Sequence, residues 1–304
     1  MEKTSPEKLA AIKLHLRQSG GYAGKPVERI RLEMAETAIT MPAHPGVSIQ
    51  AETIGSLYGE WIRPADLNAN MERRAILYFH GGGFVSGTCA FYRDLGSRIA
   101  LAGGAKMLIP EYRLAPEFPY PAANEDCLLA YRWLLAHGYA PRDIVFGGDS
   151  VGGSLALMTM LALRDHGEPL PSGAFLLSPH ADLVHLDGES YRTRAETDPT
   201  GSLEASRRIL DDYLGAHREE VPLLSPLRMN LEALPGLLIQ VGGHEVLLSD
   251  AERLADRARA AGVPVELEVW EGMWSVFQFL GGLLPEARQA IANIGGFVQS
   301  RLAP

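Results

Sequence analysis

The sequence predicts an α/β fold, a mostly parallel sheet of eight strands with helices on both faces. Short apolar segments of strand character alternate along the chain with longer segments whose apolar residues recur every three or four positions. Such alternation is typical of parallel sheets, because each connection between parallel strands needs a crossover. The 304 residues, 46% of them hydrophobic, are enough for one domain with a substantial core and a small cap.

Each expected strand is a short run rich in β-branched, aromatic and leucine side chains. In chain order these runs cover residues 47–53, 58–63, 75–79, 106–110, 144–146, 174–177, 237–241 and 265–269. The expected helices show apolar residues three and four positions apart and cover residues 92–102, 122–137, 151–165, 250–261 and 285–301. Two segments fall outside this alternation, residues 1 to about 41 and residues 186 to about 220.

The composition restricts the partners and the compartment. The net charge of -9, with no basic cluster longer than Arg73-Arg74, argues against nucleic acid, because phosphate binding needs basic patches. Cys89 and Cys127 match no metal or redox spacing and are expected to be free thiols in a reducing compartment. Residues 1–20 carry an amphipathic helical pattern, with no apolar core long enough for a signal peptide or a membrane span. We therefore expect a cytoplasmic protein that has neither nucleic acid nor a membrane as its partner.

A serine flanked by glycines follows the fifth expected strand, in the run FGGDSVGG at residues 146–153. In the pattern G-x-S-x-G, the glycines let the backbone turn tightly from strand to helix, so that the serine Oγ projects from the top of the sheet. The helix N-terminus behind the serine favours negative charge. The pattern therefore predicts that Ser150 is a nucleophile.

A second glycine-rich motif, HGGGF at residues 80–84, follows the apolar strand expected over residues 75–79. Three consecutive glycines allow backbone N–H groups to approach a ligand closely. Together, the two motifs describe an acyl-transfer site in which Ser150 attacks a carbonyl carbon. We expect the N–H groups of Gly81, Gly82 and Val151 to stabilise the charge that develops on the carbonyl oxygen.

With these motifs, the chain resembles the hormone-sensitive-lipase-like family of α/β-hydrolase carboxylesterases. The resemblance also includes EYRLAPE at residues 111–117, PYPAA at 119–123 and LSP at 177–179, and it runs from about Leu9 to the end of the chain. It implies a single α/β-hydrolase domain over residues 1–304, with a helical cap formed by about 1–41 and about 186–220. It also implies a small-molecule ester of a short acyl chain as substrate and no cofactor, and it is compatible with a homodimer.

The sequence departs from the family pattern at three positions that are expected to surround the serine. His244 stands where members of the family usually carry the aspartate of the catalytic triad, and Ser275 stands where the catalytic histidine falls. His180 occupies a position that is often tryptophan, beside the acyl pocket. Because these changes converge on one pocket while the nucleophile and the glycine loop are intact, they suggest a redesigned or engineered esterase site.

Three hypotheses follow for the missing base. In the first, the site is catalytically impaired, because Ser275 cannot act as a general base. In the second, the site is rewired, with His244 or His180 as the base and Glu245, Asp182 or the other histidine as the orienting group. In the third, His180 and His244 hold a metal ion or support a non-natural reaction, although their spacing matches no metal motif.

The rewired site, with His244 favoured over His180, is the hypothesis we carry forward, and no metal is expected. A side chain at position 244 is expected to point toward the space beside Ser275. Aromatic and sulfur side chains near the two motifs, Phe84, Met273 and Trp274, are expected to line the substrate pocket.

Overall fold

The computed structural model describes residues 3–19, 21–22, 24–215 and 222–302. Its centre is one eight-stranded sheet with the order β1-β2-β4-β3-β5-β6-β7-β8. The strands are β1 Val47–Ile54, β2 Leu57–Pro64, β3 Ala75–Phe79, β4 Lys106–Pro110, β5 Ile144–Asp149, β6 Gly173–Leu177, β7 Gly236–Gly242 and β8 Val265–Trp270. Only the pairs β1–β2 and β2–β4 are antiparallel, so the expectation of a mostly parallel sheet of eight strands is confirmed.

Strand β5 is longer than the sequence predicts, because two glycines continue it to Asp149. Gly147 and Gly148 pair with Phe175 and Leu176 of β6. A Cβ atom on Gly147 would lie 2.3 Å from the ring of Phe175, so the glycine makes room for this aromatic side chain. The glycines therefore belong to the end of the strand as well as to the turn that follows.

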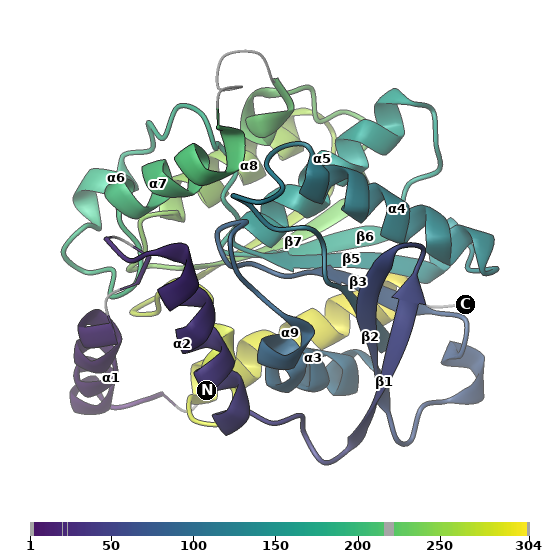
Figure 1. The fold of residues 1–304 in the computed structure, drawn as a ribbon, viewed down its shortest axis with the longest axis horizontal. Coiled ribbons are helices and arrows are strands. Elements are labelled where there is room, and N and C mark those ends of the chain that lie inside the picture. The colour runs from purple at the N-terminus through teal and green to yellow at the C-terminus, as the bar shows by residue number, and fades with distance from the viewer. Residues whose placement is uncertain (1–2, 20, 23, 216–221, 303–304) are drawn as a thin grey trace.

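Helices cover both faces of the sheet (Figure 1). On one face lie α3 Cys89–Gly103 and α9 Pro285–Arg301, and on the other lie α4 Ala122–Ala136, α5 Val151–Asp165 and α8 Leu248–Ala260. Shorter 3₁₀ turns occupy Ala69–Met71, Pro141–Asp143, Pro222–Leu224, Pro226–Arg228 and Phe277–Leu280. Helix α5 is buried on nearly all sides, since it packs directly behind the central strand that carries the serine motif.

Four further helices lie together on one side of the molecule, α1 Pro6–Ser19, α2 Val27–Thr40, α6 Ser190–Thr193 and α7 Leu203–Leu214 (Figure 1). Two arginine side chains join the segment of α1 and α2 to the segment of α6 and α7. Arg17 donates to the carbonyl oxygen of Glu196 at 2.6 Å, and Arg208 donates to the carbonyl oxygen of Tyr22 at 3.1 Å. The expected end of the second cap segment, near residue 220, lies outside the described residues. No helix in the described ranges is long and apolar enough to cross a membrane.

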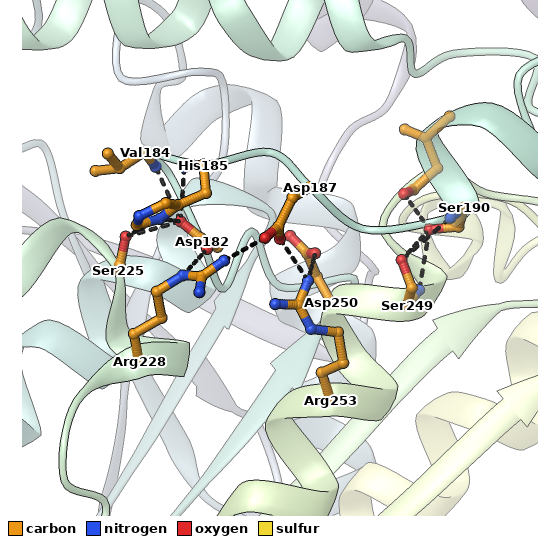
Figure 2. Close-up of polar contacts among 11 residues, drawn as sticks. Asp182, Val184, His185, Asp187, Ser190, Ser225, Arg228, Ser249, Asp250 and Arg253 are labelled. Carbon is orange, nitrogen blue, oxygen red and sulfur yellow. Dashed lines mark hydrogen bonds and ion pairs between the residues drawn. The ribbon is translucent and has the colours of Figure 1, made fainter.

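An ionic network fixes the segment that leaves β6 for α6 (Figure 2). The buried carboxylate of Asp182 accepts hydrogen bonds from Ser225 Oγ at 2.7 Å and from Arg228 Nε at 2.7 Å. Asp187 then accepts from Arg228 and from Arg253 of α8 at 2.8 Å. These bonds tie the segment to α8 and to the 3₁₀ turn at Arg228, and they fix the start of the second cap segment.

Asp250 belongs to this network but is fully buried, and neither of its carboxyl oxygens has a hydrogen-bond partner among the described residues. Its nearest cation is Arg253, with Nη1 4.0 Å from Oδ1. Burial, followed by repulsion from Asp182, raises the pKa of Asp250 to about 7. Because the pKa is higher in the folded state than in the unfolded state, this group lowers stability as pH rises from about 4 to 7.

We expect Asp250→Asn to raise the free energy of unfolding by roughly 2–4 kcal/mol at pH 8 and by less than about 1 kcal/mol at pH 4, since one pKa unit corresponds to about 1.4 kcal/mol. Denaturant unfolding at the two pH values measures both changes. Asp187→Asn is the matched control and should destabilise the protein at pH 8, because Arg253 and Arg228 lower the pKa of Asp187. An equal effect of Asp250→Asn at both pH values would contradict this account.

Candidate active site

Ser150 sits in a tight turn between β5 and α5. Its backbone angles, φ 51° and ψ -120°, are strained for a residue with a side chain. The turn requires glycine on both sides: a Cβ atom on Gly148 would lie 2.4 Å from the Gly152 carbonyl oxygen, and one on Gly152 would lie 2.0 Å from the Phe79 carbonyl oxygen. The Ser150 amide donates to the carbonyl oxygen of Leu177 at 2.9 Å. This is the geometry of a nucleophile elbow.

Asp149 organises the glycine loop beside the elbow. Its Oδ1 accepts hydrogen bonds from the Gly81 amide at 2.9 Å and from the Tyr78 hydroxyl at 2.8 Å, and its Oδ2 accepts from the Tyr92 hydroxyl at 3.0 Å. Burial raises the pKa of Asp149 to about 6, and the three hydrogen bonds act against that rise. The sequence analysis missed this residue; its signal is an aspartate at the end of an otherwise apolar, buried strand.

The expected set of oxyanion donors needs a correction at Gly81, because its N–H points to Asp149. Gly82 and Gly83 both line the cavity, with φ of 109° and 65°. Neither amide has an acceptor within the part of the chain that the structure describes. The Val151 amide begins α5, where an N–H group has no intrahelical partner. The residues whose amides the cavity brings to a ligand are therefore Gly82 and Gly83, and the Val151 amide remains an expected donor.

A cavity of about 550 Å³ opens above Ser150. It brings together residues far apart in the sequence: Ser150, Gly82, His180, Ser275 and Trp274 among the expected site residues, and Leu16, Tyr22, Met34, Phe91, Asp198, Ser206, Ile209 and Leu247 among those that the motifs did not identify. The helices α1, α2 and α7 contribute much of the wall. Most of these side chains are apolar, which suits a ligand with a hydrocarbon part.

Two expected lining residues are in the core instead. Phe84 is fully buried and stacks on Tyr213, with the ring centroids 3.7 Å apart. Met273 is buried in a cluster with Trp274 and Phe277, behind the cavity wall. Both corrections have the same cause, since an apolar side chain near a pocket gains most by packing away from water.

His180 belongs to the cavity wall and is 2% exposed. Its amide donates to the carbonyl oxygen of Ser150 at 3.2 Å, and its Nε2 lies 3.1 Å from Ser206 Oγ on α7. Its Nδ1 has no hydrogen-bond partner among the described residues. Burial lowers the pKa of His180 to about 4, although the nearby Asp182 acts to raise it. The imidazole is therefore neutral at pH 7.

His244 points away from the cavity, toward helix α1. Its Nδ1 lies 2.6 Å from Lys13 Nζ, its Nε2 lies 3.7 Å from Glu271, and about a third of the side chain is exposed. Burial and the neighbouring Lys13 lower the pKa of His244. The structure thus brings His180, and not His244, to the cavity of Ser150. The expectation that favoured His244 fails because Lys13, which lies far away in the sequence, holds its ring.

The two carboxylates expected to orient a base are engaged elsewhere. Glu245 is fully buried, and its Oε2 accepts from Ser178 Oγ at 2.9 Å and from the Gly242 amide at 2.7 Å. Burial raises the pKa of Glu245 well above its usual value. Asp182 is occupied by the ionic network of Figure 2. Neither has a direct hydrogen bond to His180 or His244 among the described residues.

Ser275 lies on the cavity wall, half-buried, in the loop after β8. The loop is fixed by its next residue, Val276, whose amide donates to Ser178 Oγ at 3.0 Å. Across the described residues, Ser150 Oγ has no hydrogen-bond partner, and Ser275 supplies no base to it. The two hydroxyl groups therefore share one cavity.

The metal hypothesis finds no ligand set in the structure. His180 lines the cavity while His244 contacts Lys13, so these two side chains do not converge. Among the described ranges, no group of three or more His, Cys, Asp or Glu side chains is arranged to hold a metal ion. Cys89 and Cys127 are both buried free thiols.

Comparisons with known proteins agree with this architecture. A family model described as the alpha/beta hydrolase fold matches residues 76–279. An acetyl-hydrolase of Streptomyces hygroscopicus is 41% identical over 248 residues, which are 82% of this chain and 81% of that protein.

Two solved structures superpose on almost the whole chain. An esterase from the bacterial hormone-sensitive lipase family is 40% identical, with a TM-score of 0.93 over 99% of this chain and 100% of the other. EstE5 soaked with p-nitrophenyl butyrate is 37% identical, with a TM-score of 0.92 and the same coverage. This chain therefore belongs to the hormone-sensitive-lipase family of esterases with the α/β-hydrolase fold.

Proposed function

We propose that this protein hydrolyses short-chain carboxylic esters through an acyl-enzyme on Ser150. The observation that carries the proposal is the strained turn at Ser150. The serine shares a cavity with Gly82 and Gly83, whose amides have no acceptor among the described residues. Such amides stabilise the oxyanion that forms when Oγ attacks a carbonyl carbon. The acetyl-hydrolase and the esterase soaked with p-nitrophenyl butyrate support acetyl and butyryl esters as first substrates.

Within this mechanism, His180 is the general base. Its side chain lines the cavity, and its backbone amide is bonded to the carbonyl oxygen of the serine. A base with a pKa of about 4 is a weak proton acceptor at pH 7, and Ser206 already occupies its Nε2. We therefore propose an esterase whose turnover of simple esters is slow. Failure of a serine-directed reagent to label Ser150 would favour the alternative of a ligand-binding protein or a non-natural reaction.

His180→Gln is expected to lower kcat/KM for p-nitrophenyl butyrate by about two orders of magnitude, the lower range for a positioned base. His244→Gln is the matched control and should leave kcat/KM within about twofold, because its ring contacts Lys13 and Glu271. The wild-type rate should be level from pH 6.5 to 8, since the lowered pKa of His180 keeps the imidazole neutral there. A rate that rises through pH 6.5 and is lost in His244→Gln would assign the base to His244 instead.

A further inference from the structure

No basic side chain among the described residues forms a hydrogen bond with the nucleophile in the cavity. Ser150 Oγ has no hydrogen-bond partner among the described residues, and Ser275, on the same wall, presents only a short hydroxyl. The loop that carries Ser275 is held by the hydrogen bond that the Val276 amide donates to Ser178 Oγ. Ser150 and Ser275 therefore line the same cavity.

The electrostatics of the wall favour a cation in this cavity. Asp198 lines it, is 5% exposed, and forms no ion pair with any residue in the described ranges. Its oxygens accept only from neutral donors, including the Gly201 amide at 2.8 Å and the Val246 amide at 2.8 Å. Val246 belongs to the loop after β7, and that loop is bonded through His244 to the loop of Ser275. Burial lowers the pKa of Lys13, and Asp198 acts against that change. A buried carboxylate of this kind stabilises positive charge nearby.

We propose that the site takes esters whose acyl part carries a basic amine, and that this amine acts as the general base beside Ser275 with Asp198 as its counter-charge. The proposal rests on Ser150 as the nucleophile. It extends the proposed function by naming a substrate class that supplies a stronger base than His180, whose pKa is about 4. Simple esters rely on the weakly basic His180 and react slowly.

The proton balance requires the amine to be in the acyl part. The amine nitrogen takes the Ser150 Oγ proton as the bond from Oγ to the carbonyl carbon forms. It then gives that proton to the alcohol oxygen as the ester bond breaks. Because the amine remains on the acyl-enzyme, it takes a proton from the attacking water and returns it to Oγ as the acid leaves. An amine in the alcohol part would leave with the alcohol, before water hydrolyses the acyl-enzyme.

The test compares three ethyl esters of similar shape with the wild-type protein at about pH 8. The 4-(dimethylamino)butanoate carries a basic nitrogen, the 4-(trimethylammonio)butanoate carries a cation that cannot accept a proton, and the 5-methylhexanoate is neutral. Ethanol release is measured, and release with Ser150→Ala is subtracted as background. We expect kcat for the dimethylamino ester to exceed both others by roughly 10²-fold, and to rise with pH as its amine loses a proton.

Each other outcome overturns the proposal. Equal rates for the two nitrogen esters, both above the neutral ester, would show that the cavity selects charge alone. Equal rates for all three would show that it selects neither charge nor base. Loss of acylation for every ester, measured as the mass of the intact protein, would instead refute Ser150 as the nucleophile and with it the proposed function.

A substitution at Ser275 tests where in the cavity the substrate amine binds. Ser275→Leu fills the space beside the nucleophile, so the ratio of the dimethylamino rate to the neutral rate should fall from roughly 10² to near one. Ser275→Val makes the same test with a smaller side chain if the leucine variant does not fold. A ratio that stays high in a folded variant would place the amine away from Ser275.

Discussion

Ser150→Ala is expected to abolish hydrolysis of p-nitrophenyl butyrate above background. Ser150 is the serine that the strained turn presents to the cavity, whereas Ser275 is held on a different loop. The readouts are the rate of p-nitrophenol release and the mass of the intact protein after reaction with a sulfonyl fluoride. The wild type should gain one adduct and the variant none.

The matched control for this loss is Ser300→Ala, an exposed serine on α9 far from the cavity. It should retain full hydrolysis and full labelling. Undiminished hydrolysis in Ser150→Ala would show that the reaction bypasses the elbow, and loss of that activity to a chelator would then assign it to a metal ion.

The double change His244→Asp and Ser275→His is expected to raise turnover of the same ester by about two to four orders of magnitude, the contribution of a positioned general base. It introduces the acid and the base that the resemblance to the family leads us to expect at these positions. Either change alone should gain much less, because such residues act as a unit. Steady-state kcat of the two single variants and the double variant measures the coupling.

Ser275→Gln with His244→Asp is the control for this gain, since glutamine has similar bulk and cannot act as a base. The double variant with histidine should also lose the preference for the dimethylamino ester, because its own imidazole fills the space beside Ser150. If kcat of the double variant His244→Asp and Ser275→His does not rise, position 275 does not face Ser150.

Much of the fold could be predicted because the information is local. A strand such as β3 is a continuous apolar run between polar residues, and its bounds match the sequence prediction. The same holds for helix α5, where glycine spacing marks the start and apolar periodicity gives the length. The serine turn could be predicted for the same reason, because a few adjacent residues determine its backbone conformation.

The sequence by itself thus predicted the strands of the sheet, the helices that cover it, the serine turn and the glycine loop. Tertiary structure alone decided which side chains face the serine. His244 turns to Lys13, a partner 231 residues away in the sequence, and the Gly81 amide turns to Asp149, 68 residues away. The direction of a side chain depends on the contacts that lower its free energy, and these contacts exist only after distant elements have packed. His180 therefore reaches the cavity, while His244, at a position equally prominent in the sequence, does not.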